Sequence, residues 1–215
     1  MLEDIENLRK EYSASTLDVG DVNEDPLLQF GNWFGEAMAA QLPEPNAMIL
    51  ATSTPDGMPS ARTVLLKAAD EQGFVFYTNY ESRKGKVLER NPRAALVFLW
   101  LELQRQVRVE GLIEKVSREE SEAYFISRPK GSQIGAWVSP QSQPIDGRDI
   151  LEAKTIELER QYAGSEYLPL PPNWGGFRVR PTLLEFWQGR PNRLHDRIQY
   201  TLLEKGKWKI ERLAP

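Results

Sequence analysis

Short apolar runs separated by turn residues dominate the chain from Asn46 onward. The runs lie at residues 47–53, 61–68, 74–79, 94–101 and 106–116, and a last hairpin turns at Lys205-Gly206. They are rich in β-branched and aromatic residues, and turn residues such as Pro55-Asp56-Gly57 stand between them. Runs of this kind predict consecutive antiparallel strands, and their close spacing favours a barrel.

Helices are predicted before and between these strands. Asp25-Pro26 has the form of an N-cap followed by a first-turn proline. The inward face of the helix that they open is predicted to carry Leu27, Phe30, Trp33, Phe34, Ala37 and Met38. Further helices are predicted at 82–90, 117–127 and 148–163, the second of which begins with the capping-box pattern of Ser117 and Glu120. The fold class is therefore mainly β with flanking helices (α+β).

The N-terminus has a different texture from the rest of the chain. Ile5, Leu8 and Tyr12 recur at helical spacing, which predicts a short helix. Residues 13–24 are polar and acidic, which predicts a mobile stretch. We therefore divide the chain into an N-terminal helix with a mobile segment at 1–24 and a single domain at 25–215. The stretch PLPPNWGG is interpreted as a structured turn rather than a linker.

Composition narrows the function classes. A chain of 215 residues with 40% hydrophobic residues is large enough for one domain with its own core. The formal net charge of −4 argues against nucleic-acid binding, which needs many cations against phosphates. The chain has no cysteine and a single histidine, so we expect no metal centre built from thiolates or several imidazoles. No apolar run approaches membrane-spanning length, and a soluble, cytoplasmic protein is expected.

Two cations stand in the predicted strand at 61–68. The two-residue period places Arg62, Val64 and Leu66 on one face and Thr63, Leu65 and Lys67 on the other. The two cations are thus predicted to point to opposite sides. They are either ordinary surface charges on a barrel strand or contacts for an anionic ligand such as a phosphate.

A second pair of cations begins a predicted helix. Arg83 and Lys84 follow Ser82, directly after the end of a strand. A strand end, a helix N-terminus and paired cations together can hold a phosphate. The alternative is a solvated helix start, and the local pattern does not separate the two.

Two more polar patterns allow ligand contacts. Gln104, Gln106 and Arg108 form a polar face along the strand at 106–116, which faces either a ligand or water. Tyr124 and Arg128 lie four residues apart and share a helix face, with Ser132 just beyond. A hydroxyl pair with a guanidinium forms a second candidate phosphate site, although each residue alone is more often a surface residue.

The segment EFWQGRPNRLHDR is the densest in charge. Trp187 precedes Arg190, Arg193, His195 and Arg197. Anionic ligands would explain the clustered cations. A hydrogen-bonded histidine with arginines paired to Asp196 and other acids is the alternative, and the segment alone favours it.

An ordered series of motifs nevertheless resembles one family. RTVLLK, FYTN-x-x-SRKG, RQVRVEG, YFxSRP, SQIGAWVSxQS, WGGFRV, EFWQG, RLHDR and the final ERLAP are similar to the pyridoxine/pyridoxamine 5′-phosphate oxidase family. The resemblance runs from about Leu8 to Pro215. It implies an antiparallel FMN-binding split β-barrel that forms a homodimer, with FMN bound at two inter-subunit sites.

The resemblance also implies roles for particular residues. The positions expected to contact FMN are Arg62, Thr63, Val64, Leu65, Leu66, Lys67, Tyr77, Thr78, Arg83, Lys84, Gln106, Gln141, Ser142, Trp187 and Arg197. The positions expected to contact the substrate are Arg9, Lys10, Glu11, Tyr12, Lys67, Tyr124, Arg128, Ser132, Arg193, Leu194 and His195. Arg193 and His195 are the catalytic candidates, and residues 9–12 match a segment that folds over bound substrate.

The activity implied is oxidation of pyridoxamine 5′-phosphate and pyridoxine 5′-phosphate to pyridoxal 5′-phosphate. Dioxygen is the acceptor, hydrogen peroxide is released, and the amine substrate also yields ammonia. The alternatives are another split-barrel flavin or deazaflavin reductase, a haem-handling relative, and a non-catalytic flavin- or vitamer-binding module. The acidic residues at 13–24 depart from basic residues in some relatives, which puts any auxiliary ligand contact there in doubt.

Overall fold

The computed structural model describes residues 10–215, and the predicted short N-terminal helix and Arg9 fall outside this range. The helices are α1 (Pro26–Ala39), α2 (Arg83–Arg90), α3 (Arg118–Ser127), α4 (Lys130–Val138) and α5 (Arg148–Gln161). The strands are β1 (Ala47–Ser53), β2 (Pro59–Leu65), β3 (Ala68–Asp70), β4 (Gly73–Asn79), β5 (Arg93–Trp100), β6 (Arg105–Lys115), β7 (Trp174–Gln188), β8 (Asp196–Leu202) and β9 (Trp208–Leu213). Short 3₁₀ turns lie at Val19–Asp21, Pro191–Arg193 and Glu204–Gly206.

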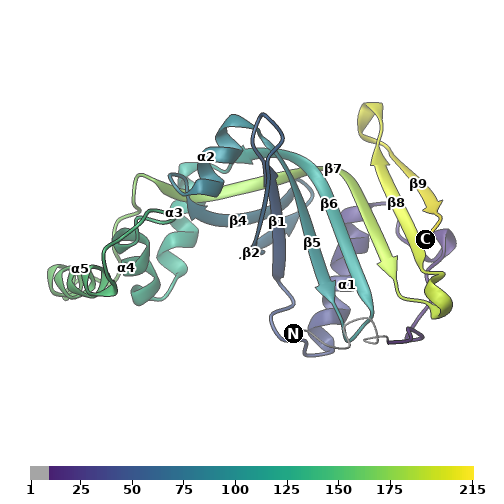
Figure 1. Cartoon of the computed structure of the whole chain (residues 1–215), viewed down its shortest axis with the longest axis horizontal. Coiled ribbons are helices and arrows are strands. Elements are labelled where there is room, and N and C mark those ends of the chain that lie inside the picture. The colour runs from purple at the N-terminus through teal and green to yellow at the C-terminus, as the bar shows by residue number, and fades with distance from the viewer. Residues whose placement is uncertain (1–9) are drawn as a thin grey trace, which may run out of the picture.

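The strands form one curled antiparallel sheet (Figure 1), in the order β2-β1-β5-β6-β7-β4-β3. β7 is the long strand that joins its two parts. Residues 174–179 pair with β4, whereas residues 183–188 pair with β8, which in turn pairs with β9. Pro181 stands between the two paired stretches, and a proline has no N–H for a further ladder bond. The sheet therefore divides along one edge of β7.

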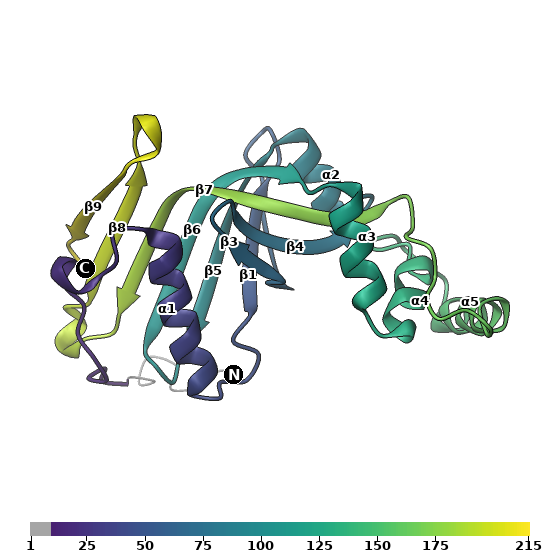
Figure 2. The same cartoon turned by 180° about the vertical axis from the view of Figure 1, so that it is seen from behind.

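α1 covers one face of the sheet, as Figure 2 shows. The Asp25 carboxylate accepts a hydrogen bond from the Leu27 N–H, as the sequence predicts for an N-cap. Phe30 and Trp33 are buried. The Trp33 ring makes an edge-to-face contact with Phe186, which belongs to the sheet. The predicted inward position of Met38 is wrong, because its side chain is 58% exposed.

A second, smaller core lies under the helices at the other end of the molecule. Phe125 of α3 and Ile134 of α4 pack with Leu168, Leu170 and the first residue of β7. The chain between α5 and β7 runs through this core, which fixes the place of Trp174. The helical end and the β8–β9 end therefore lie at opposite ends of the molecule (Figure 1).

The predicted class, mainly β and antiparallel with flanking helices, is confirmed. To within a few residues, the predicted elements match seven strands and four helices: β1, β2, β4, β5, β6, β8, β9, α1, α2, α3 and α5. β3, α4 and β7 were not predicted. The turn interpreted at PLPPNWGG ends at Asn173, because Trp174 to Gly176 already belong to β7.

Among residues 10–215, the structure holds no helix with the length and hydropathy needed to cross a membrane.

Residues 13–24 follow the β8–β9 end of the sheet. Leu17 is buried, and its N–H donates to Asp196 of β8 at 3.1 Å. The Arg212 guanidinium of β9 donates to the Leu17 carbonyl at 2.8 Å and pairs with Asp18 at 3.0 Å. This stretch therefore has fixed partners in the structure, while its predicted mobility stays a prediction.

Candidate functional site

A cavity of about 560 Å³ opens between β2, β4 and the helical end of the molecule. Many of the residues implied by the resemblance line it: Arg62, Thr63, Val64, Leu65, Lys67, Tyr77, Thr78, Lys84, Tyr124, Arg128, Ser132 and Gln141. Leu66 is the exception among its neighbours, because its side chain is buried in the main core. β2 ends at Leu65, and the Lys67 N–H then donates to the Val75 carbonyl. Strand alternation therefore stops before Lys67, and Arg62 and Lys67 line the same cavity although alternation predicted that they point to opposite sides.

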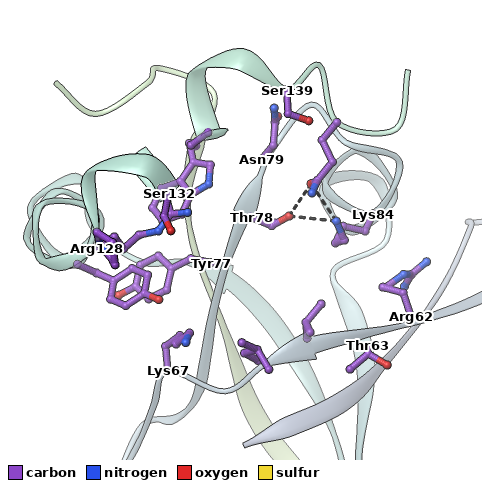
Figure 3. Close-up of a pocket in the computed structure, with 17 residues that line it drawn as sticks. Arg62, Thr63, Lys67, Tyr77, Thr78, Asn79, Lys84, Arg128, Ser132 and Ser139 are labelled. Atoms are coloured by element: carbon purple, nitrogen blue, oxygen red, sulfur yellow. Dashed lines mark hydrogen bonds between the residues drawn. The ribbon is translucent and has the colours of Figure 1, made fainter. Parts of the chain in front are cut away.

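One end of the cavity holds Arg62 and Lys84 (Figure 3). The Arg62 guanidinium donates to the Leu50 carbonyl at 3.0 Å and to the Thr52 hydroxyl at 2.9 Å. The Lys84 ammonium donates to Thr78 Oγ1 at 3.1 Å and to Gln141 Oε1 at 3.0 Å. Burial lowers the pKa of Lys84, and the nearby charge of Arg62 lowers it further. This end thus concentrates positive charge on oriented side chains.

The other end of the cavity holds Lys67, Arg128 and Ser132 (Figure 3). Tyr124 also lines this cavity. The Tyr124 ring stacks on Tyr77 at a centroid distance of 3.9 Å, and the Arg128 guanidinium lies 4.7 Å from the Trp174 ring centroid. Burial lowers the pKa of Arg128. Its Nη1 atom is buried without any hydrogen-bond partner. A buried guanidinium nitrogen left in this way is costly unless an acceptor binds there.

Neither end has an acidic partner. Within residues 10–215, the ion pairs include none of Arg62, Lys67, Arg83, Lys84 and Arg128. Cations gathered in a partly buried cavity repel one another, and an anionic ligand removes that cost. The two ends are therefore two candidate anion sites, which we name the Arg62–Lys84 site and the Lys67–Arg128 site.

Arg83 turns away from the cavity that Lys84 lines. It lines a neighbouring cavity of about 610 Å³ with Ser142, and Gln141 lines both cavities. Ser82 caps α2 by accepting a hydrogen bond from the Gly85 N–H at 3.2 Å, so the two cations are the first two residues of the helix. Arg83 and Ser142 therefore flank the Arg62–Lys84 site from the outside.

A second group of predicted residues lies at the far end of β7. Trp187 and His195 meet at a centroid distance of 4.5 Å, and Tyr12 lies 5.9 Å from each ring. A cavity of about 690 Å³ at this place is lined by Lys10, Glu11, Tyr12, Arg190, Asn192, Arg193 and His195. Asn192 and Arg193 both have left-handed backbone conformations, with φ of 56° and 61°. Such strain is often stored at functional sites.

His195 is held through its Nδ1 atom, which accepts a hydrogen bond from the Arg190 N–H at 3.1 Å. Burial lowers the pKa of His195, the charge of Arg193 lowers it further, and Asp196 opposes both. The neutral ring therefore carries its proton on Nε2, since Nδ1 is the acceptor. Nε2 is then a hydrogen-bond donor on a ring that lines the cavity.

The arginines of this segment divide into paired and unpaired groups. Arg197 binds Glu185 through Nε and Nη2, both at 3.0 Å, and Arg190 lies 3.6 Å from Asp196. The predicted alternative of arginines paired to acids thus holds for these two. Arg193 forms no ion pair within the described residues, and Leu194 is 69% exposed. Gln106 lies opposite Trp187 in the β6–β7 ladder.

The two groups of residues lie far apart within one chain. Trp174 borders the first cavity and Trp187 the second group, and β7 separates them by roughly 40 Å of extended strand. Figure 1 shows the same separation between the helical end and the β8–β9 end. The residues implied for the substrate are therefore divided, with Lys67, Tyr124, Arg128 and Ser132 in one place and Arg193 to His195 in the other.

Some contributors were missed by the sequence reasoning. Trp174 stacks with Tyr77 at 5.5 Å and supports Arg128, a role that the motif WGGFRV does not predict. The Glu185 carboxylate is only 3% exposed and binds two arginines. It accepts hydrogen bonds from Arg197 and from Arg108, the latter at 3.1 Å. A lone acid among apolar strand residues is the signal that marks Glu185. Gln104 was predicted on a polar face that meets either a ligand or water, and its side-chain oxygen accepts hydrogen bonds from the Ser13 and Ala14 N–H groups.

The curled antiparallel sheet carries two candidate anion sites beside stacked aromatic rings, an arrangement that suits an anionic aromatic ligand. A family model described as pyridoxamine 5′-phosphate oxidase matches residues 34–162. A second, described as the pyridoxine 5′-phosphate oxidase C-terminal dimerisation region, matches residues 174–215. The chain belongs to the pyridoxamine 5′-phosphate oxidase family.

Individual relatives agree with this assignment. A protein from Nostoc sp. named pyridoxine/pyridoxamine 5′-phosphate oxidase is 58% identical, over 98% of both chains. A protein of the same name from Burkholderia mallei is 59% identical, over 97% of this chain and 98% of its own. Among solved structures, PhzG from Burkholderia lata in complex with tetrahydrophenazine-1-carboxylic acid has a TM-score of 0.86 at 30% identity, covering 94% of this chain and 100% of its own.

A more distant structure shows the fold alone. An FMN-binding protein from Nostoc punctiforme, related to pyridoxamine 5′-phosphate oxidase, has a TM-score of 0.68 at 18% identity. It covers 86% of this chain and 96% of its own. The split-barrel fold implied by the motifs is therefore confirmed.

Proposed function

We propose that this protein is an FMN-dependent oxidase that converts pyridoxamine 5′-phosphate and pyridoxine 5′-phosphate to pyridoxal 5′-phosphate, with dioxygen as acceptor. Relatives that carry this enzyme name are 57% to 59% identical along nearly the whole chain. The observation that carries the proposal is the presence of two separate anion sites in one cavity. A phosphorylated cofactor and a phosphorylated substrate together require two such sites.

The residues of the Arg62–Lys84 site fit the phosphate of FMN. Two cations, the Thr78 hydroxyl and the Gln141 amide converge there without an acidic partner. Arg83 and Ser142 lie on the outer side, where they would complete the contacts to a phosphate. When bound, FMN supplies the hydride acceptor and the site of reoxidation by dioxygen. The chain's contribution at this site is to bind and orient.

The Lys67–Arg128 site fits the substrate phosphate. The unpartnered Arg128 Nη1 atom needs an acceptor, and Lys67, Tyr124 and Ser132 offer further donors around it. A phosphate supplies several acceptor oxygens at once. The stacked rings of Tyr77 and Tyr124 restrict the cavity beside it, so a flat substrate is held in one orientation.

A homodimer would bring the two groups of residues together. The C-terminal dimerisation region covers 174–215 and therefore includes Trp187, Arg193, His195 and Arg197. In the proposed assembly, Arg193 and His195 of the partner subunit face the cavity of this chain. Exposed apolar residues of β1 and β5, such as Ile49 at 42% and Leu99 at 53%, offer a surface that a second copy can cover.

His195 then acts on the substrate as a hydrogen-bond donor. Its Nδ1 is used by the Arg190 N–H, and its lowered pKa keeps the ring neutral near pH 7. A general base needs a free lone pair, which Nε2 lacks in this tautomer. We therefore assign His195 to holding the substrate by a donated hydrogen bond, and Arg193 to positioning it by charge.

The test uses the purified protein and its natural colour. We expect a yellow preparation with a flavin spectrum, which forms aldehyde and hydrogen peroxide when pyridoxamine 5′-phosphate is added in air. A flavin that is reduced only by a nicotinamide donor would identify a reductase instead. Binding of pyridoxal 5′-phosphate without oxygen consumption would indicate a non-catalytic module. A colourless preparation that stays inactive with added FMN would rule the proposal out.

A further inference from the structure

The ring of Tyr12 occupies a closely fitted place beside Trp187 and His195. Its centroid lies 5.9 Å from each of the two rings. Gly189 makes room for it, because a Cβ atom on Gly189 would lie 2.8 Å from both Cβ and Cγ of Tyr12. Contacts this close mean that Tyr12 is docked against the chain and does not merely pass by it.

Gln104 is the residue that holds the backbone next to Tyr12. Its side-chain Oε1 accepts hydrogen bonds from the Ser13 N–H at 2.8 Å and from the Ala14 N–H at 3.0 Å. Its backbone carbonyl accepts from the Gly189 N–H at 2.7 Å. One residue in the turn between β5 and β6 therefore ties the N-terminal segment to the chain that forms the seat of Tyr12.

The backbone of Gln104 is itself strained. Its φ is 56°, in the left-handed region that residues other than glycine and asparagine seldom adopt. Such a conformation costs of order 1 kcal/mol or more and persists only where the surroundings enforce it. Here the enforced conformation directs the amide oxygen towards Ser13 and Ala14.

The segment has a second attachment a few residues further on. Leu17 and Asp18 are bound by Asp196 and Arg212, and this attachment includes ion pairs. The Gln104 attachment consists of two neutral, solvent-exposed hydrogen bonds. Charge-assisted bonds are roughly twice as strong as neutral ones. Residues 10–14 can therefore detach while Leu17 and Asp18 stay bound.

We propose that Gln104 is a positioning residue that holds Tyr12 over the Trp187–His195 end of the substrate site. With the two bonds made, Tyr12 closes that end and keeps bound substrate from leaving. With them broken, the segment lifts and the site exchanges substrate and product. The inference rests on the proposed function, because it assumes that Trp187 and His195 face the substrate.

Only the acceptor oxygen of Gln104 takes part in these bonds, and this makes a sharp pair of variants. Gln104→Glu keeps an acceptor at the same place, whereas Gln104→Met keeps the length and loses the acceptor. We expect Gln104→Met to raise KM for pyridoxamine 5′-phosphate about three- to tenfold with FMN content and kcat nearly unchanged. Gln104→Glu should stay within about twofold of the parent. Gln72→Met, in an exposed turn outside the site, is the matched control and should change nothing.

A double-mutant cycle tests whether Gln104 acts through Tyr12. In a Tyr12→Ala background, Gln104→Met should add less than about a twofold change in KM, because the ring that it positions is gone. Effects that multiply independently in the double variant would overturn the proposal. Equal behaviour of Gln104→Glu and Gln104→Met would overturn it as well, since the acceptor oxygen would then be irrelevant.

A readout without catalysis separates this proposal from the function. Trypsin cleavage after Lys10, followed by mass spectrometry, should be several-fold faster in Gln104→Met than in the parent or Gln104→Glu. If the parent shows no oxidase activity but this difference persists, the proposed function fails and the attachment by Gln104 stands. If the parent is an active oxidase and Gln104→Met matches it in both KM and cleavage rate, the role of Gln104 is refuted.

Discussion

His195 shows how its neighbours set the protonation state of one side chain. Burial and the charge of Arg193 lower its pKa, and the Arg190 N–H binds the lone pair of Nδ1. When the pH falls through that lowered pKa, Nδ1 takes a proton and can no longer accept the bond. The unfolded chain takes up this proton at a higher pH, near the ordinary pKa of about 6.5. As the pH falls from there to the lowered pKa of the folded protein, the folded state therefore loses stability.

The pKa of His195 can be measured directly, because the chain has only one histidine. We predict a pKa below about 6.5 in the parent protein. Arg193→Gln removes a repelling cation and should raise that pKa, whereas Asp196→Asn removes an attracting anion and should lower it. The measurement is the shift of the single histidine C2–H proton by NMR across pH 4 to 8. An unchanged pKa in Arg193→Gln would contradict the electrostatic explanation.

Substitutions at the two anion sites should affect different ligands, FMN at one site and the substrate at the other. Arg83→Ala combined with Lys84→Ala removes charge around the Arg62–Lys84 site and should weaken FMN binding by about tenfold or more. FMN affinity is measured by fluorescence titration of the apoprotein. The double variant Arg148→Ala with Lys154→Ala removes two exposed cations of α5 that line neither cavity, and it is the control. Unchanged FMN affinity in the first pair would count against this site.

Arg128→Ala acts on the other anion site. It removes the buried, unpartnered guanidinium and should lower kcat/KM for pyridoxamine 5′-phosphate by about 10- to 100-fold, since a charged hydrogen bond contributes about 1.5–3 kcal/mol. The protein should stay yellow. Arg193→Ala and His195→Ala should likewise reduce kcat/KM and retain FMN, measured by absorbance of the purified variants. Loss of flavin in any of the three would move that residue to the cofactor side.

At this scale the sequence predicted residue types better than directions. Tyr124 and Arg128 do face one cavity, because helical spacing fixes their common side. Arg62 and Lys67 share that cavity although strand alternation separated them, because the strand ends between them. Pairing of Arg197 with Glu185 depends on a ladder between β7 and β8 that no local pattern encodes. The predicted direction of a side chain therefore failed where a secondary-structure element ended or where a tertiary contact determined the orientation of the side chain.

At the scale of elements, α2 depends on the absence of a side chain at Gly85. A Cβ atom there would lie 2.1 Å from the Tyr80 carbonyl oxygen, which is backbone and cannot turn aside. Gly35, by contrast, is exposed in the middle of α1 and has nothing within 4 Å of its Cβ position. The same substitution therefore has opposite predicted effects in two helices.

Gly85→Ala should destabilise the fold by about 1–3 kcal/mol and weaken FMN binding, because α2 must shift together with Lys84. Gly35→Ala should stabilise it by about 0.5–1 kcal/mol, since alanine is the better helix former. Both are measured by thermal unfolding, where about 1 kcal/mol corresponds to about 2–4 °C for a chain of this size. A Gly85→Ala protein with an unchanged Tm would refute the close contact.

The elements that sequence reasoning missed have a shared physical cause. β7 contains Gly175, Gly176 and Pro181, which normally interrupt strands, and its pairing on both sides compensates for them. α4 follows Pro129, which had been read as the end of a helix, and has no side-chain cap at its start. Packing of Ile134 and Val138 in the second core holds α4 in place. Tertiary contacts thus outweighed local propensity in both elements.

At the scale of the whole molecule, the candidate site is divided along β7. The cavity with both anion sites lies at the helical end, and Trp187, Arg193 and His195 lie at the other. The sequence motifs implied inter-subunit sites, and the structure shows which of the implied residues one chain keeps apart. That separation follows from the length of β7, and it is explained if two copies each contribute half of every site.

Subunit complementation tests this arrangement directly. Arg128→Ala disables one half of the site and His195→Ala the other, so each homodimer should be nearly inactive with two damaged sites. In a mixed dimer, one site carries both substitutions and the other carries neither. If subunits pair at random, half of the dimers are mixed, and co-expression should restore about a quarter of the parent activity. Two affinity tags isolate the mixed dimer, which should then show about half the parent activity per dimer.

The control pairs two substitutions from the same half. Co-expressed Arg128→Ala and Lys84→Ala both damage the cavity, so every site in every dimer keeps at least one damaged residue, and mixing should restore nothing. Restoration in this pair as well would point to recombination or to partial activity of the single variants. If the first pair regains no activity although the tags show mixed dimers, both halves must belong to one chain. That outcome would require β7 and its flanking segments to refold, because their present geometry keeps the two halves apart.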